Sequence, residues 1–183
     1  MGSLVGSKRN VKIFVLYLMQ NINYPLDYVT INDIVMQNDY VMHLDFAEAF
    51  AEMLDGGLVE EVYKNDSGDA MYMVTGKGRI VATELHSEIL ASLLDKSMEC
   101  ALRYLDFKKR GVSAGCRIEK REDGMFDLVC FLKEKSVIIL ETHVVIDTLN
   151  RAQRMENNFR DHPEIVYKGL LSLLSGNMNF IFS

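Results

Sequence analysis

The side chains that most often carry out catalysis or bind metals are spread along this chain without the spacing that either task needs. The four histidines stand at 43, 86, 143 and 162, and the three cysteines stand at 100, 116 and 130. No two cysteines have the CxxC spacing of a metal site, and no Ser or Cys lies in a nucleophile-elbow pattern. We therefore expect no metal, no cofactor and no catalytic residue, and we interpret the protein as non-enzymatic.

One glycine-rich stretch, Thr75-Gly-Lys-Gly, superficially suggests a phosphate-binding loop. The Walker pattern needs a glycine five positions before Gly76, where Met71 stands, and a Ser or Thr at the position of Gly78. Both requirements fail. The stretch instead predicts the start of a helix, with Lys77 near its first turn.

Charge is unevenly distributed along the 183 residues, which carry a net charge of −6. Residues 1–106 hold 8 Lys and Arg against 16 Asp and Glu, whereas residues 107–183 hold 12 against 10. A nucleic-acid-binding half is normally basic, so the acidic first half is unusual for that role. The absence of a long apolar run or a signal sequence, with unpaired thiols, predicts a cytoplasmic protein without a membrane span.

Apolar spacing in the first third of the chain predicts three helices. The first covers residues 11–22 and is closed by Pro25, and the second covers 28–38 with Thr30 as its N-cap. The third follows the turn at Asn38-Asp39 and ends at Gly56-Gly57, where one glycine is expected in the left-handed conformation.

The period of the apolar residues changes to two after these glycines. Residues 58–64 and 70–75 read as strands joined by the turn-forming sequence NDSGD, and together they predict a β-hairpin. A helical stripe then extends over residues 79–106 without Pro or Gly. A single helix of this length exceeds the needs of a small core, so we interpret it as a linking helix and dimer seam. The alternative, packing within the chain, stays open.

Two segments in this order, AFAEMLDGGLVEE (49–61) and MYMVTGKGRIVA (71–82), carry a resemblance to a known class of proteins. They resemble the winged helix-turn-helix of PadR- and MarR-type bacterial transcription regulators over about residues 8–83. In those families a third helix ends at a glycine step into the first wing strand, and the second wing strand leads into the next helix. The resemblance implies a dimeric DNA-binding protein.

Residues 108–183 predict a second, smaller unit. Segments 112–121 and 126–132 flank Asp123-Gly124, a strong hairpin signal, and 136–145 predicts a third strand. If Asp123-Gly124 is a two-residue turn, Cys130 faces Arg117 and Cys116 faces Phe131, so the cysteines are not partners. Two amphipathic helices follow, over 148–159 and after Pro163.

The whole chain is similar to an uncharacterised bacterial family, a domain of unknown function described only as candidate regulators. The predicted class is α+β. A winged-helix domain with a long dimerisation-type helix would occupy residues 1–107. A small domain of three antiparallel strands and two helices would occupy residues 108–183.

The third predicted helix is the one that would enter the DNA major groove, yet it carries no Lys or Arg. On a helical wheel Phe46, Ala49, Phe50 and Met53 form the core face. Four acids occupy a separate arc: Asp45, Glu48, Glu52 and Asp55. The third arc is apolar and is a candidate partner interface: Leu44, Ala47, Ala51 and Leu54.

Candidate DNA contacts are the bases and hydrogen-bonding side chains around this helix and the hairpin: Lys8, Arg9, Lys12, Tyr40, His43, Lys64, Lys77 and Arg79. Candidate dimer contacts on the linking helix are Leu90, Leu94, Met98 and Leu102. Four carboxylates facing phosphates would repel DNA. Two hypotheses therefore stand: a homodimeric transcription regulator that contacts duplex DNA, or a winged-helix module that binds a protein partner and no DNA.

Overall fold

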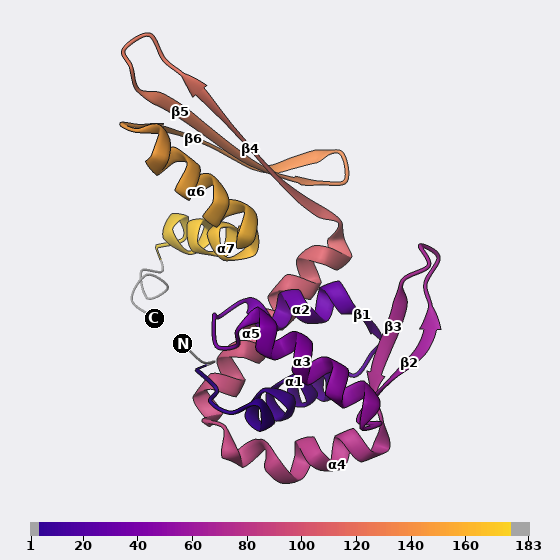
Figure 1. The fold of residues 1–183 in the computed structure, drawn as a ribbon. Helices are drawn as coiled ribbons and strands as arrows, with labels where there is room; N and C mark the ends of the chain where they lie inside the picture. The colour runs from indigo at the N-terminus through magenta and orange to yellow at the C-terminus, as the bar shows by residue number, and fades with distance from the viewer. Residues whose placement is uncertain (1–3, 177–183) are drawn as a thin grey trace. The chain divides into compact units, whose positions relative to one another are not determined.

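The computed structural model describes residues 4–176 and divides them into two compact units, with the boundary between Arg103 and Tyr104 (Figure 1). The boundary predicted from the sequence, after residue 107, also lies within the helix that contains this boundary, α5 (Ala91–Arg110). Each unit combines a three-stranded antiparallel sheet with helices. The predicted α+β class is confirmed.

Helix α1 (Lys8–Ile22) is the centre of the first unit. Ser7 begins it by accepting a hydrogen bond from the Asn10 amide, and Asn23 ends it in the left-handed conformation at φ 57°. Its buried side chains point in nearly every direction around the axis: Val11, Ile13, Phe14, Val15, Leu16, Leu18, Met19 and Ile22. The helix is therefore enclosed by the unit rather than lying on its surface.

A two-residue strand, β1 (Leu26–Asp27), follows α1 and was not predicted from the sequence. Leu26 pairs with Tyr72 of β3 (Ala70–Val74), which gives the sheet order β1-β3-β2. Helix α2 (Tyr28–Met36) begins at Asp27, whose Oδ1 accepts the Thr30 amide at 2.8 Å. The predicted Thr30 cap is wrong, because the carboxylate three residues earlier already accepts that amide.

Helix α3 (His43–Asp55) ends as predicted, with Gly57 in the left-handed conformation at φ 64°. The hairpin of β2 (Val59–Lys64) and β3 follows, and the Asn65 side chain accepts two amides of its turn. Helix α4 (Gly76–Leu85) begins at Thr75, whose hydroxyl accepts the Gly78 amide and donates to the Gly57 carbonyl at 2.8 Å. The predicted hairpin and helix start are confirmed.

The single helix predicted over residues 79–106 is wrong. Helix α4 ends at Leu85, a 3-10 turn η1 covers His86–Glu88, and α5 begins at Ala91. Ile89 between them has an extended backbone, at φ −111° and ψ 142°, and its side chain is buried. Burial of Ile89 in the first unit outweighs the continuous hydrogen bonding that helix propensity alone would favour.

The break also changes the predicted dimer stripe. Leu94 is only 3% exposed and is therefore part of the chain's own core, so its assignment to a dimer interface is wrong. Leu90 and Leu102 are 75% and 52% exposed, and Met98 is half-buried. Within residues 4–176, no helix has the length and apolarity that a membrane crossing requires.

The second unit holds the sheet β4-β5-β6, formed by β4 (Val112–Lys120), β5 (Phe126–Glu134) and β6 (Val137–Ile146). The two predicted helices are present as α6 (Leu149–Asp161) and α7 (Pro163–Leu174), and both lie on one side of the sheet (Figure 1). Leu128, Cys130 and Leu132 face these helices and pack with Ala152 and Phe159. Alternate residues of the strands face the opposite side.

The predicted separation of the two cysteines in this sheet is wrong. Cys116 and Cys130 are direct register partners on β4 and β5, and their Sγ atoms are 2.9 Å apart. The hairpin turn is longer than two residues, because the Arg121 amide bonds the Met125 carbonyl and Gly124 has φ 83°. This three-residue loop with a left-handed glycine shifts the pairing by one position.

Gly78 provides a sharp test of the packing between α4 and the hairpin. A Cβ atom there would collide with the Leu58 carbonyl oxygen and lie 2.7 Å from Val74 Cγ1. We expect Gly78→Ala to lower the free energy of unfolding by about 1–3 kcal/mol, the usual cost of overpacking. The matched control is Gly76→Ala in the same helix, where a Cβ meets nothing within 4 Å. Urea unfolding monitored by circular dichroism should separate the two variants, and equal stability would contradict this account of α4.

Candidate nucleic-acid interface

The faces of α3 divide as the helical wheel predicts. Phe46, Ala49, Phe50 and Met53 are buried against the rest of the first unit. Phe46 and Phe50 also join an aromatic cluster with Tyr28 of α2 and Tyr72 of β3, with ring centroids 5.1–5.6 Å apart. This cluster fixes the rotation of α3 about its axis, so the acidic and apolar arcs have defined directions.

Two acids of α3 are paired with lysines of α1, which sequence reasoning did not anticipate. Lys8 Nζ lies 2.7 Å from Glu48 and 3.1 Å from Glu52, and Lys12 Nζ lies 2.8 Å from Glu52. The four charges form one ladder between the two helices. Lys8 and Lys12 were candidate DNA anchors, and here they neutralise acids of their own unit.

The ladder is a stable feature of the charge state at neutral pH. The hydrogen bond from Lys12, and then that from Lys8, lowers the pKa of Glu52 below its ordinary value of 4.5. Hydrogen bonds to Glu48 and then to Glu52 raise the pKa of Lys8. Both shifts favour the charged forms, so the Lys8–Glu52 pair persists between the lowered pKa of the glutamate and the raised pKa of the lysine. Because the groups are solvent-exposed, their contribution to stability is small.

Most other candidate cations also have partners within the first unit. Arg9 pairs with Glu88 at 2.7 Å, and Arg79 donates to the Asn23 side chain at 2.8 Å. Lys77 donates to the Gly56 carbonyl at 2.8 Å, at the end of α3.

Lys64 at the end of β2 is exposed, and the described part of the chain shows no partner for it. Of the six predicted bases, Lys64 is the one ready to meet a phosphate.

The uncharged DNA-contact candidates lie at the start of α3. His43 is the first residue of the helix and is exposed, whereas Tyr40 is half-buried in the preceding turn. The hairpin turn carries Asp66 and Asp69 and presents no base. The hairpin therefore offers a phosphate only Lys64, at its edge.

The apolar arc of α3 remains open to solvent at its N-terminal end. Leu44 is 72% exposed and Ala51 is exposed, while Ala47 and Leu54 are half-buried. The first unit therefore leaves the side chain of Leu44 uncovered. An exposed leucine beside a neutralised charge ladder is chemically suited to contact with another protein.

No local signal in the sequence reveals the ladder, because its partners are 40 and 44 residues apart. The available clue was the composition of each helix: α1 begins with three bases, and α3 carries acids and no base. Two neighbouring helices with opposite charges are expected to align them. Predicting that alignment also requires the rotation of each helix.

Within residues 4–176, the side chains form no group of three His, Cys, Asp or Glu that could hold a metal ion. Comparison with known proteins gives one family. No curated protein matches the chain, and no solved structure matches it. A family described as a domain of unknown function matches residues 11–174, which include every helix and strand from α1 to α7 in whole or in large part. The chain belongs to this family, DUF4364.

Proposed function

We propose that residues 8–85 are a winged helix-turn-helix of the PadR and MarR type and that the protein is a non-enzymatic, cytoplasmic regulator of transcription. The element order α1-β1-α2-α3-β2-β3-α4 supports this proposal. The observation that carries it is the sheet order β1-β3-β2, in which the short strand after α1 pairs with the second strand of the hairpin. That pairing brings the hairpin beside α3, as a wing lies beside a recognition helix.

The proposed contact with duplex DNA uses α3 in the major groove and the hairpin on the backbone. His43 at the exposed start of α3 would reach base edges, and Lys64 would contact a phosphate. The other bases are held in intramolecular pairs, so binding requires an exchange of partners. Exposed pairs are worth little, and phosphates can compete for them at low salt. We therefore propose weak binding that salt readily abolishes.

A second candidate function is a winged-helix module that binds protein instead of DNA. The observation that favours it is the ladder, because Glu48 and Glu52 already neutralise the two lysines nearest to α3. The exposed Leu44 and Ala51 beside it form an apolar surface. A partner helix or strand with apolar residues would bury this surface without meeting an uncompensated charge.

We also propose that the regulator is a homodimer, with the exposed leucines of the α4–α5 region in the seam. Leu90 and Leu102 support this proposal, because their exposed side chains offer apolar area that a second copy of the chain could bury. The exposed part of the Met98 side chain would also lie in the dimer interface. Leu94 is buried in the core of the first unit and would not contact the second copy. A dimer would present two copies of α3 to a DNA duplex.

Binding to generic duplex DNA separates the two candidate functions. We expect the intact protein to bind a fluorescent duplex at about 20 mM salt and to release it as salt rises, because nonspecific binding is mostly electrostatic. Lys64→Gln should reduce the slope of log affinity against log salt by about 1. Lys133→Gln, an exposed lysine of the second unit, is the control and should leave the slope unchanged. No binding at low salt would overturn the DNA proposal in favour of the protein-binding module.

The charge ladder predicts a gain of DNA binding from removal of an acid. Glu52→Gln removes the counter-charge of Lys12, while Lys8 keeps its ion pair with Glu48, so we expect tighter binding and a salt slope larger by about 1. Asp55→Asn removes the same charge from the same helix but releases no lysine, and should leave the slope unchanged. Fluorescence anisotropy measures both variants. Equal changes in the two would show that net charge, not lysine release, governs binding.

The dimer proposal is tested by sedimentation velocity at micromolar concentration. We expect the wild-type protein to sediment as a dimer and Leu102→Glu to sediment as a monomer, since a buried carboxylate at the seam would lack a partner. Leu171→Glu on α7, where the leucine is 49% exposed, is the matched control and should remain dimeric. A monomeric wild-type protein would overturn the proposal.

A further inference from the structure

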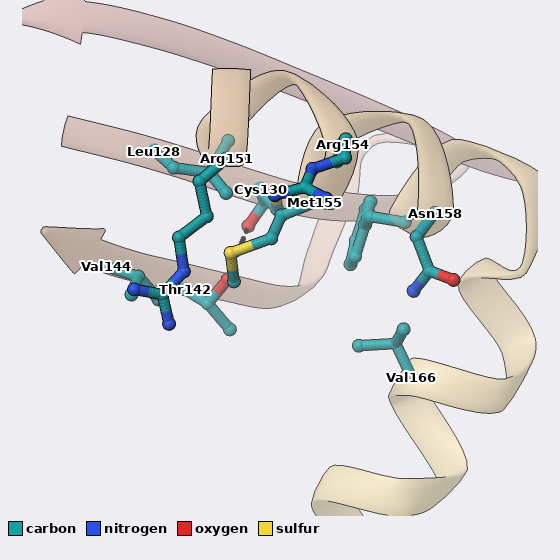
Figure 2. Close-up of a pocket in the computed structure, with 10 residues that line it drawn as sticks. Leu128, Cys130, Thr142, Val144, Arg151, Arg154, Met155, Asn158 and Val166 are labelled. Carbon is teal, nitrogen blue, oxygen red and sulfur yellow. Dashed lines mark hydrogen bonds between the residues drawn. The ribbon is translucent and has the colours of Figure 1, made fainter. Parts of the chain in front are cut away.

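The second unit contains a cavity of about 510 Å³ on the helix-covered side of its sheet. Its floor is formed by β5 and β6, its wall by α6, and one end by Val166 of α7 (Figure 2). The lining is mainly apolar: Leu128, Cys130, Val144, Met155, Phe159 and Val166. A volume of this size lies within the usual range of small-molecule sites.

The cavity exists because α6 does not cover the whole sheet. Ala152 and Phe159 of α6 pack on the sheet, and Arg160 donates to the Cys116 carbonyl on β4 at 3.2 Å. That contact holds α6 toward the β4 edge. The β6 edge is consequently left open, and Val144 there is 41% exposed although it points to the helix side.

Cys130 is an apolar part of this lining rather than a reactive thiolate. Burial, followed by the hydrogen bond with Cys116, raises the pKa of the Cys130 thiol to about 12. The group is therefore neutral at physiological pH. Thr142 donates its hydroxyl to the Cys130 carbonyl, which leaves its methyl group for the cavity.

Positive charge is confined to the rim, on α6. Arg151, Arg154 and Asn158 line the cavity on successive turns of this helix. Figure 2 shows Arg151 extending from α6 toward Thr142 and Val144. Two guanidinium groups beside an apolar cavity are arranged to hold an anionic head while the cavity holds an apolar body.

Arg154 differs from the other arginines of α6 in lacking an acid one turn away. Arg151 pairs with Asp147 and Arg160 pairs with Glu156, each four residues earlier. The equivalent positions around Arg154 are Asn150 and Asn158. In the described structure Arg154 accordingly has no ion-pair or hydrogen-bond partner, and its charge remains available to a ligand.

We propose that this cavity is a binding site for a small organic carboxylate with an aliphatic or aromatic body. The carboxylate would bind Arg154, with Arg151 beside it, and the body would lie against Met155, Val144 and Phe159. All of these residues belong to the second unit, so the proposal is independent of DNA binding by the first unit.

Titration calorimetry with octanoate and octylamine tests the chemistry of the head group. The two probes share one apolar chain, so we expect octanoate to bind with one site per chain and octylamine to bind at least tenfold more weakly. Arg154→Gln should weaken octanoate binding roughly tenfold, the loss of one charge-assisted hydrogen bond. Arg117→Gln, an exposed arginine on the opposite side of the sheet, is the matched control and should change nothing.

A second pair of variants tests the position of the body. Val144→Trp should fill the cavity and abolish binding, whereas Val145→Trp, a neighbour 50% exposed on the other side of the strand, should retain it. The Met155 methyl resonance, identified by its loss in Met155→Leu, should shift with octanoate. Equal binding of both probes, an equal effect of Arg117→Gln, or retained binding in Val144→Trp would each overturn the proposal.

Discussion

The enclosure of α1 is the constraint on which the first unit depends. Its buried side chains occupy almost the whole circumference of the helix, including Ile13 and Leu16 as well as the predicted stripe. A helix buried on all sides must also bring its polar residues into the unit, and burial of an unpaired charge is costly. Lys12 is half-buried at the start of α1, and Glu52 supplies its counter-charge. The acids Glu48 and Glu52 of α3 therefore have a role within the first unit, as counter-charges for Lys8 and Lys12, that needs no external partner.

The elements that depend on local chemistry could be predicted from the sequence. Gly57 ends α3, the Asn65–Asp69 turn joins the hairpin, and Thr75 begins α4, because each relies on neighbours within a few residues. Strand β1 could not be predicted, since two residues carry no periodicity and their pairing partner lies some 45 positions away. The break at Ile89 could not be predicted for the same reason. The local apolar pattern is helical, but burial of Ile89 against residues distant in the sequence gives it an extended backbone.

The candidate interface likewise combines features that the sequence could predict with features that it could not. The helical wheel correctly separated the core, acidic and apolar faces of α3, because that separation depends only on periodicity. It could not show that Lys8 and Lys12 face the acids, since this depends on how α1 is rotated against α3. The register of Cys116 with Cys130 is a related case, where one additional turn residue exchanges the partners of a whole strand.

The cations near α3 and the arginines of α6 differ in how many of them already have a partner. In the first unit nearly every cation near α3 is engaged by a neighbour, so recognition of an anion there requires breaking an existing contact. In α6 of the second unit two arginines have acids one turn earlier, and Arg154 has asparagines on both sides. An anion that binds Arg154 breaks no ion pair of that side chain within the described residues. Binding an anion at the cavity therefore costs less free energy than binding one at α3, where an existing ion pair must break. We expect the second unit to bind anions more tightly than the first.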